Sequence, residues 1–337
     1  MAKIAINGFG RIGRQTFKAG WGKLGFDVVA INDLTDAKTL AYLLKYDTNY
    51  GKWNVSVRAD NGNLVVDGKK IPVLAEKDPA DLPWEHMGVD IVIESTGFFR
   101  TKEAAVAHIN AGAKRVIISA PAKGEGVPTY VMGANTSKLG EEKSAIINNA
   151  SCTTNCSTPM IAILDEAFGV EKAMLSTVHG YTSTQKLVDG PHKDLRRGRA
   201  AAVNMIPTST GAAQATAEAY ANIEGRFDGI SIRVPIPTTS LSDVTAVLKK
   251  EVTVDEVNAA IKKACKTLRW KGVADFTEEP LVSSDFVGNS YSAVFDLPMT
   301  RVVDGNLVKV LAWYDNEWGY ACRLAELAVM AGKSYKK

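Results

Sequence analysis

Cys152 is the residue in this sequence whose setting most directly suggests chemistry. It lies in the polar stretch NNASCTTNC (148–156), between an apolar, strand-like run and the helix-like run TNCSTPMIAILDEAF. A thiol at the start of a helix faces unpaired amides and the positive end of the helix dipole, which stabilise a thiolate and lower the thiol pKa. Pro159 leaves the helix register open, because proline requires a later start or a kink. On this motif alone, Cys152 is either a nucleophile or a small buried side chain.

A nucleophilic cysteine needs a base, and the sequence contains four histidines. His179 ends a strand-like run in STVHGYT and precedes a glycine, which is how catalytic groups are often presented. His86 and His108 lie in helix or loop settings and His192 lies in a charged loop, where solvated or core roles are expected. We therefore take His179 as the candidate base, although a histidine at a strand end is often only a hydrogen-bonded structural residue.

The remaining cysteines are expected to be structural. Cys156 shares a helix face with Cys152, whereas Cys265 and Cys322 lie in half-apolar, helix-like contexts typical of core residues. No further cluster of cysteine and histidine completes a set of four ligands, so no metal site is predicted.

Three segments in the second half offer groups that could bind small anions. They are YTSTQ (181–185), PTSTGAA (207–213) and SIRVP (231–235), which supply hydroxyls, backbone amides and an arginine. The charged run DLRRGR (194–199) could add a phosphate-facing arginine, although such a run is more often a solvated loop. Taken singly, each segment is more often a turn or a helix cap.

A glycine-rich turn near the N-terminus predicts a dinucleotide site. NGFGRIGR places Gly8, Gly10 and Gly13 directly after the strand-like KIAING. Glycine allows a tight turn and a close approach of the pyrophosphate to the backbone. The amides of Arg11 and Ile12 then open a helix whose positive end faces that anion.

Asp33 refines the prediction of the nucleotide. It ends the next strand-like run, 20 positions beyond Gly13, where a carboxylate accepts hydrogen bonds from the adenosine ribose and repels a 2′-phosphate. Leu34 follows, and no Arg or Lys is at hand to neutralise such a phosphate. The cofactor prediction is therefore NAD rather than NADP. An ordinary turn capped by an exposed aspartate is the alternative.

The elements that must position these residues read as two domains. Short apolar runs at 3–8, 27–33, 89–96 and 114–121 alternate with helix-like runs, which is typical of a doubly wound parallel sheet of the Rossmann type. Residues 50–75 alternate apolar and polar positions around DNGN and DGK, which predicts inserted antiparallel hairpins.

The second half has a different pattern. Strand-like runs at 170–182, 227–237, 241–250, 291–297 and 307–315 lie among a few helices, which predicts an α+β domain with a mixed, mostly antiparallel sheet. We expect a nucleotide-binding domain at 1–150 and a catalytic substrate domain at 151–315, with a C-terminal helix (316–337) packing back on the first domain.

Composition excludes several other classes of protein. The 337 residues are 46% hydrophobic and 23% charged, and no apolar run is long enough to cross a membrane. The N-terminus lacks the pattern of a signal peptide, and a chain this long with four cysteines is typical of a reduced, cytoplasmic protein. A net charge of +3 is too small to imply nucleic acid as a partner.

These motifs together resemble one family, the phosphorylating glyceraldehyde-3-phosphate dehydrogenases. The matching segments, in order, are INGFGRIGR, ASCTTNC, TVHGYT, LRRGRAAAVNMIPTSTGAA, RVPIPTTS and WYDNEWGY. The resemblance covers essentially the whole chain. It implies a glycolytic and gluconeogenic enzyme that uses NAD and inorganic phosphate to convert D-glyceraldehyde 3-phosphate to 1,3-bisphosphoglycerate, through a cysteine thiohemiacetal and thioester. It also implies a homotetramer.

The resemblance assigns roles by matching motifs. It implies that Cys152 is the nucleophile and that His179 is the base. Residues implied to bind the attacking inorganic phosphate are Ser151, Thr153, Thr210 and Gly211. Residues implied to contact anions, mainly the substrate's own phosphate, are Thr182, Arg197 and Arg233. Residues implied to bind NAD are Gly8, Gly10, Arg11, Ile12, Asp33, Lys77 and Ser119, with Asn316 on the nicotinamide amide.

Two alternatives remain at this stage. Erythrose-4-phosphate dehydrogenase resembles this layout but uses water at the thioester step, whereas the intact PTSTGAA and LRRGRAAA segments favour phosphate. The other alternative is an NAD-binding redox sensor in which Cys152 is oxidised rather than catalytic. Such a sensor would have little use for several anion-binding segments and a matched histidine.

Overall fold

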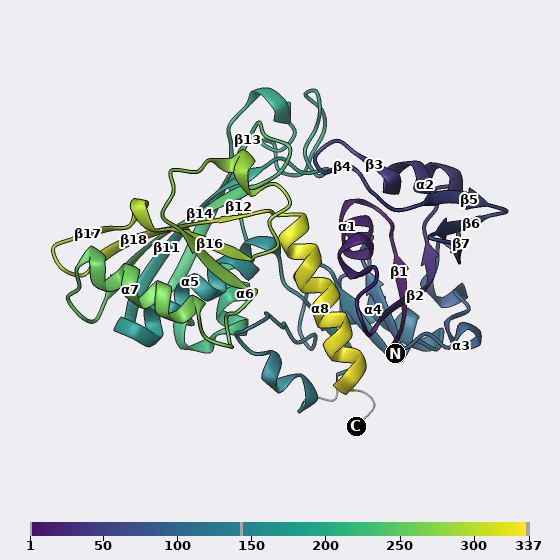
Figure 1. The fold of residues 1–337 in the computed structure, drawn as a ribbon, viewed down its shortest axis with the longest axis horizontal. Coiled ribbons are helices and arrows are strands. Elements are labelled where there is room, and N and C mark those ends of the chain that lie inside the picture. The colour runs from purple at the N-terminus through teal and green to yellow at the C-terminus, as the bar shows by residue number, and fades with distance from the viewer. Residues whose placement is uncertain (1, 142–143, 335–337) are drawn as a thin grey trace. The chain divides into compact units, whose positions relative to one another are not determined.

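A computed structural model describes residues 2–141 and 144–334. The chain divides into two compact units, each with its own sheet (Figure 1). The first unit comprises Met1–Tyr130, Ser137–Ala150 and Ala321–Lys337, and the second comprises Val131–Thr136 and Ser151–Tyr320.

The first unit is built on a sheet with the strand order β10-β9-β8-β1-β2-β7-β6-β5. Its strands from β10 to β7 are all parallel, which confirms the doubly wound, Rossmann-type class. The strands are β1 (Ala2–Asn7), β2 (Phe26–Asn32), β5 (Val57–Asp60), β6 (Asn63–Val66), β7 (Lys69–Leu74), β8 (Ile91–Glu94), β9 (Arg115–Ile118) and β10 (Ile146–Asn148).

Helices accompany these strands. They are α1 (Arg11–Gly20), α2 (Ala37–Lys45), α3 (Trp84–Met87) and α4 (Lys102–Asn110), with short 3-10 helices at Pro79–Asp81 and Thr136–Gly140. Polar residues cap α2 and α4: Asp36 accepts from the amide of Thr39 at 3.0 Å, and Thr101 accepts from the amide of Ala104 at 3.2 Å. Such caps fix where α2 and α4 begin.

The predicted hairpins join the parallel sheet. The β5–β6 turn holds Asn61 and Gly62 at φ 45° and 75°, and the β6–β7 turn holds Asp67 and Gly68 at φ 47° and 82°. Both turns therefore use the left-handed conformations that short hairpins require. Strand β7 also pairs in parallel with β2, so the hairpins extend the main sheet. A separate pair, β3 (Tyr46–Asp47) and β4 (Gly51–Lys52), follows α2.

The second unit is built on a mixed sheet with the order β12-β13-β11-β14-β18-β16-β15, in which β17 also pairs with β18. The pairs β11–β13 and β15–β16 are parallel and the other pairs are antiparallel, as the sequence predicted. The strands are β11 (Val170–Gly180), β12 (Ile206–Ser209), β13 (Phe227–Val234), β14 (Ser240–Leu248), β15 (Ala274–Thr277), β16 (Ala293–Asp296), β17 (Arg301–Val303) and β18 (Leu307–Tyr314).

Three helices pack against this sheet: α5 (Cys152–Phe168), α6 (Ala212–Ala219) and α7 (Val254–Cys265) (Figure 1). Short 3-10 helices lie at Ala201–Val203, Ala221–Ile223, Ser283–Phe286 and Leu297–Met299. Helix α8 (Trp318–Ser334) begins in the second unit and belongs to the first from Ala321 onward. The core of the second unit includes Ile161, Val244 and Val310, none of which has measurable exposure.

Strand β12 was not expected from the sequence, where PTSTGAA read as a turn. It lies at the edge of the sheet and contains Pro207. A proline cannot donate to a strand ladder, but an edge strand tolerates it. β12 positions the Thr210–Gly211 segment that follows it.

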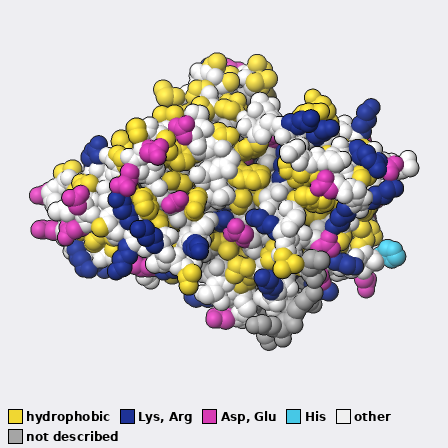
Figure 2. Space-filling view, in the orientation of Figure 1, with side chains coloured by type: hydrophobic (Ala, Val, Ile, Leu, Met, Phe, Trp, Pro, Cys, Tyr) yellow, Lys and Arg dark blue, Asp and Glu magenta, His cyan; other side chains and the backbone are white. Residues whose placement is uncertain are grey.

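The surface carries charges of both signs, and Figure 2 shows acidic and basic side chains spread over the visible face. Among the described residues, no helix is both long and apolar enough to cross a membrane.

Candidate functional site

Cys152 is the first residue of α5 in the second unit. Ser151 caps this helix, because its hydroxyl accepts a hydrogen bond from the Thr154 amide at 3.0 Å. Ala150, just before the cap, has the left-handed φ of 54°. Pro159 lies inside the helix without delaying its start, so the thiol occupies the helix N-terminus.

His179 lies on β11, whose neighbours bring the rest of the site to it. In the sheet register His179 is opposite Arg233 on β13 and opposite Ser240 on β14. His179 is 3% exposed, and Nε2 of its imidazole lies 3.4 Å from Sγ of Cys152. The thiol and the imidazole are therefore within hydrogen-bonding distance.

The other ring nitrogen of His179 has two close neighbours. Its Nδ1 lies 2.6 Å from the carbonyl oxygen of Gly180 and 2.8 Å from Nη1 of Arg233. A carbonyl only accepts and a guanidinium only donates, so the position of the ring proton selects one of them. With the proton on Nδ1, the imidazole donates to Gly180, and Arg233 donates to the same carbonyl at 3.2 Å. In that tautomer the lone pair of Nε2 faces the thiol.

Burial acts against each charge of this pair taken singly. Burial, together with the guanidinium of Arg233 beside the ring, lowers the pKa of His179 to about 3. Burial also raises the pKa of the Cys152 thiol, although Arg233 and hydrogen bonds at Thr153 act in the opposite direction. The sequence-based expectation of a lowered thiol pKa is therefore wrong for the isolated group, because the helix N-terminus is visible in the sequence and the burial is not.

The two groups are better treated as one titrating pair. A thiolate and an imidazolium 3.4 Å apart carry no net charge together, so the desolvation that opposes either ion alone is largely offset. Cys152 is also partly exposed to solvent. Proton transfer from Sγ to Nε2 would therefore leave a thiolate with its counterion beside it.

Tyr314 is part of the site but was not singled out from the sequence. Its hydroxyl lies 3.0 Å from Oγ1 of Thr153 and 2.8 Å from Oγ1 of Thr177, and its ring lies edge-on to His179 with centroids 6.0 Å apart. It is 2% exposed, and burial raises the pKa of its hydroxyl. Tyr314 therefore ties the first turn of α5 to β11, and the motif WYDNEWGY is its only signal in the sequence.

Cys156 lies one turn after Cys152 and has no exposure. Its Sγ contacts Sδ of Met160 at 3.9 Å, and burial raises its pKa to about 12. Cys265 and Cys322 are likewise buried. Among the described residues, no group of three or more Cys, His, Asp or Glu side chains is placed to hold a metal ion.

Arg197 lies near the pair formed by Cys152 and His179. Its charge lowers the pKa of His179 and that of Arg233, and its Nε donates to Oγ1 of Thr208 at 2.8 Å. Nη2 donates to the carbonyl oxygen of Ser209 at 3.0 Å. The second unit thus holds a pair of arginines around His179.

The remaining anion-binding candidates lie on adjoining segments. Thr210 and Gly211 precede α6, where Gly211 occupies the N-cap and a side chain added at this glycine would enter open space. The hydroxyl of Thr182 lies 2.9 Å from that of Thr184 in the segment after β11. A glycine N-cap leaves the amides at the start of α6 accessible to an anion.

The glycine-rich turn of the first unit has the geometry that a dinucleotide requires. Gly8 has φ 90°, and a Cβ added to Gly13 would lie 2.2 Å from the carbonyl oxygen of Gly8, so α1 packs closely on β1. A Cβ on Gly10, the N-cap of α1, would instead meet nothing within 4 Å. The residues therefore fit a pyrophosphate, since Gly10 leaves open space beside the helix amides of Arg11 and Ile12.

Backbone amides of this turn and of the segment after β2 hold the side chain of Asp33 in place. One carboxylate oxygen accepts from the amide of Phe9 at 2.7 Å, and the other accepts from the amide of Thr35 at 2.9 Å. Each oxygen keeps a further lone pair, which suits the hydroxyls of a ribose. The guanidinium of Arg11 forms an ion pair with Asp47 at 2.7 Å. Arg11 can therefore contact a ligand through its backbone amide, because its side chain is already paired.

Three further predicted NAD ligands lie outside this turn. Lys77 is exposed just after β7, and Ser119 follows β9 with its amide donating to the carbonyl of Glu94 at 2.9 Å. Asn316, in the second unit, is 5% exposed, and its Oδ1 accepts from the hydroxyl of Ser240 at 3.0 Å. That bond orients the Asn316 amide beside the strand partner of His179.

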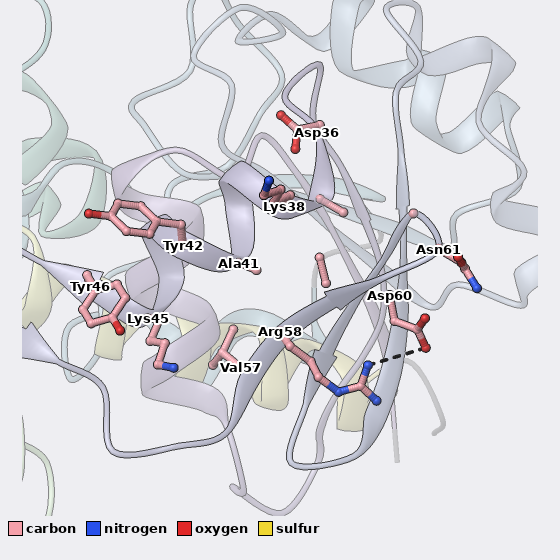
Figure 3. Close-up of a pocket in the computed structure, with 13 residues that line it drawn as sticks. Asp36, Lys38, Ala41, Tyr42, Lys45, Tyr46, Val57, Arg58, Asp60 and Asn61 are labelled. Atoms are coloured by element: carbon pink, nitrogen blue, oxygen red, sulfur yellow. Dashed lines mark ion pairs between the residues drawn. The ribbon is translucent and has the colours of Figure 1, made fainter.

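A cavity of about 600 Å³ in the first unit lies elsewhere, between α2 and the β5–β6 hairpin. Figure 3 shows Tyr42, Lys45 and Tyr46 on one side and the ion pair of Arg58 with Asp60 on the other. It contains none of the predicted site residues.

Comparison with known proteins explains these features. Residues 2–102 match the model of the glyceraldehyde 3-phosphate dehydrogenase NAD binding domain, and residues 151–316 match that of the C-terminal domain of the same enzymes. The chain is 52% identical over 331 residues to glyceraldehyde-3-phosphate dehydrogenase of Streptomyces coelicolor, covering 98% of each chain. The chain belongs to the glyceraldehyde-3-phosphate dehydrogenase family. Within this family, the enzyme of Geobacillus stearothermophilus is 52% identical over 326 residues (97% of each chain), and that of Borreliella burgdorferi is 49% identical over 332 residues (97% of this chain, 98% of the relative).

Proposed function

We propose that this protein oxidises and phosphorylates D-glyceraldehyde 3-phosphate to 1,3-bisphosphoglycerate, with NAD as hydride acceptor and inorganic phosphate as second substrate. The observation that carries the proposal is the pair formed by Cys152 Sγ and His179 Nε2, 3.4 Å apart at the N-terminus of α5. A domain of the NAD-binding type and relatives named for this activity support it.

The first step forms a carbon–sulfur bond. His179 Nε2 accepts the thiol proton, and the thiolate of Cys152 attacks the aldehyde carbon. The carbonyl oxygen becomes the alkoxide of a thiohemiacetal and takes a proton from the imidazolium. The Cys152 amide, together with His179, stabilises the negative charge that develops on this oxygen.

The second step oxidises the thiohemiacetal. His179 Nε2 removes the hydroxyl proton while the carbon loses a hydride, so the carbonyl re-forms as a thioester on Cys152. Bound NAD supplies the acceptor for that hydride. The chain's contribution is to hold the cofactor through the α1 turn and Asp33 in the first unit, with Lys77, Ser119 and Asn316 as further ligands.

The third step transfers the acyl group to phosphate. An oxygen of inorganic phosphate attacks the thioester carbon, and the Cys152 thiolate leaves to give the acyl phosphate. We assign the attacking phosphate to Ser151, Thr153, Thr210 and Gly211, which lie at the starts of α5 and α6. We assign the substrate's own phosphate mainly to Thr182, Arg197 and Arg233, two of which surround His179 with positive charge.

Dependence on phosphate tests this proposal. NADH formation from glyceraldehyde 3-phosphate and NAD should be fast with inorganic phosphate and should collapse without it to one burst per active site. Turnover that is indifferent to phosphate would mean that water attacks the thioester, as in erythrose-4-phosphate dehydrogenase. NADH formation absent under both conditions, with sulfenic acid on Cys152, would favour the redox sensor.

We also propose that the chain works as a cytoplasmic homotetramer that requires neither membrane nor nucleic acid. One face of the second sheet is covered by α5, α6 and α7, whereas Met174 and Ile230 are 59% and 47% exposed on its strands. A partly apolar sheet face of this kind suits a second copy of the chain. Sedimentation at several protein concentrations tests the assembly, and a monomer at all of them would contradict it.

A further inference from the structure

A row of buried polar side chains crosses the carboxyl ends of three parallel strands in the first unit. Asn32 on β2, Asn7 on β1 and Glu94 on β8 lie directly opposite one another in the sheet register. They are 4%, 2% and 1% exposed. Buried polar side chains are costly unless they are hydrogen-bonded, so each member of this row needs a partner. The row lies at the carboxyl ends of the strands, where parallel sheets bind ligands.

One end of the row is fixed by a backbone amide. The Glu76 amide donates to Oδ1 of Asn32 at 2.9 Å, so Nδ2 of Asn32 faces the carbonyl oxygen of Glu76 at 2.9 Å and Oδ1 of Asn7 at 2.7 Å. Asn7 must then present its own Nδ2 to Glu94, where it donates to Oε2 at 2.5 Å.

The other end is fixed by an indole. Trp84 Nε1 can only donate, and it does so to Nδ1 of His108 at 3.1 Å. His108 therefore carries its proton on Nε2, which lies 3.1 Å from Oε2 of Glu94. His108 and Trp84 have no exposure. Two fixed donors thus point at Oε2 of Glu94, which has to accept from both.

The second oxygen of Glu94 holds a loop. Its Oε1 accepts from the amide of Thr96 at 2.8 Å and from the hydroxyl of Thr96 at 2.5 Å. That loop touches the glycine-rich turn, because a Cβ on Gly8 would lie 2.6 Å from the Thr96 nitrogen and the Ser95 hydroxyl donates to the Gly8 carbonyl at 2.7 Å. Glu94 therefore fixes the segment that packs against Gly8.

Three residues of this network each precede a residue assigned to NAD. Asn7 precedes Gly8, Asn32 precedes Asp33, and Glu76 precedes Lys77. From this arrangement we infer that Glu94 and His108 are positioning residues for the dinucleotide site: their network holds the NAD-binding segments in place before the cofactor arrives. The inference rests on the proposed use of NAD. Preorganised segments lose less freedom on binding, so the network should govern NAD affinity rather than the chemistry on Cys152.

Glu94→Gln is the main test. The glutamine amide places N–H groups where Asn7 and His108 also donate, or against Thr96 if it rotates. Calorimetry should give a dissociation constant for NAD raised about tenfold, which corresponds to about 1.4 kcal/mol. The KM for NAD should rise with it, while kcat at saturating NAD and the KM for glyceraldehyde 3-phosphate stay within about twofold.

An exchange variant tests whether hydrogen-bond polarity is the cause. In Asn7→Asp/Glu94→Gln the glutamine amide can donate to the new carboxylate. His108 Nε2 lies 3.3 Å from the atom at the Asn7 Nδ2 position, so it can donate to that oxygen instead. NAD affinity should return to within about twofold of the original. Glu103→Gln, an exposed carboxylate on α4, is the matched control and should leave NAD affinity unchanged.

Two substitutions of His108 provide a milder test, which can still be made if Glu94→Gln does not fold. The longer glutamine of His108→Gln can place its amide N–H near Glu94, as Nε2 of His108 does. The shorter asparagine of His108→Asn can only place an acceptor near Nε1 of Trp84, and the donor to Glu94 is lost. The Asn variant should weaken NAD binding about threefold and the Gln variant should not. Unchanged NAD affinity in a folded Glu94→Gln or His108→Asn protein would overturn the inference. Absence of NAD binding by the unmodified protein would instead overturn the proposed function.

Discussion

The two units each present a helix N-terminus to a reactant, and they do so in different ways. In the first unit Gly10 is the N-cap of α1, where it has no side chain and open space lies beside it. In the second unit Ser151 is the N-cap of α5, where its hydroxyl accepts from the Thr154 amide, and Cys152 is the first helical residue. A helix end without a side-chain cap suits a ligand anion, whereas a capped end can present a covalent nucleophile.

The hydrogen bonds around the two sites also differ. The strand ends of the first unit hold Asn7, Asn32 and Glu94 in a connected, buried set of hydrogen bonds that favours one arrangement. Around His179 the hydrogen bonds leave a choice, because Nδ1 has both a carbonyl and a guanidinium beside it. Binding benefits from a fixed arrangement, whereas proton transfer requires a group that can gain and lose a proton.

The largest effect should come from removing the nucleophile. Cys152→Ser should lower NADH formation at least about 10⁴-fold while leaving the dissociation constant of NAD unchanged, because the thiol is the nucleophile and is not among the residues assigned to NAD. Steady-state kinetics and calorimetry measure the two quantities. Cys156→Ala, one turn along α5, is the control and should keep most of the activity. Substantial phosphorylating activity in Cys152→Ser would remove the thioester from the account.

His179→Asn should lower kcat by about 10²–10⁴-fold, since it removes the base. It should also change the pH dependence of alkylation of Cys152 by iodoacetamide. Burial raises the pKa of the thiol and lowers that of His179 to about 3, so the thiolate forms only where the imidazolium beside it stabilises its charge. Without the imidazole the thiol ionises alone, so its alkylation profile should move to higher pH. A profile that stays in place would show that the two groups do not titrate as a pair.

A pair of glycine variants separates packing from binding in the first unit. Gly10→Ala meets nothing within 4 Å, so it should leave the free energy of unfolding nearly unchanged and still weaken NAD binding about tenfold or more. Gly13→Ala places a Cβ 2.2 Å from the Gly8 carbonyl and should also lower the free energy of unfolding by about 1–3 kcal/mol. Thermal unfolding and NAD titration distinguish them. Unchanged NAD affinity in Gly10→Ala would contradict the assignment of the open space to the pyrophosphate.

Asp33→Ser should have the smallest effect. Removing the carboxylate removes its repulsion of a 2′-phosphate, so the ratio of kcat/KM for NADP to that for NAD should rise about tenfold. Part of the affinity for NAD should be lost as well, because Asp33 also holds the Phe9 amide. An unchanged ratio would mean that Asp33 only stabilises the turn.

The sequence predicted the elements better than the connections between them. The parallel and mixed sheets were visible as apolar runs, and the glycine turn was visible because its backbone requires glycine. Arg233 meets His179 through the pairing of β11 with β13, 54 positions apart, and Asn7 meets Glu94 across 87 positions. Sheet register cannot be read from local periodicity, so the contacts of Tyr314 and the hydrogen-bond partners of His108 could not be predicted.

The most direct test of the central claim is to look for the acyl-enzyme itself. The protein is mixed with glyceraldehyde 3-phosphate and NAD without inorganic phosphate, quenched in acid, and digested for mass spectrometry. The account predicts that the peptide containing Cys152 carries a 3-phosphoglyceroyl thioester, and that phosphate added before the quench removes it. NADH formed in the burst with Cys152 unmodified, or with the acyl group on another residue, would contradict the account.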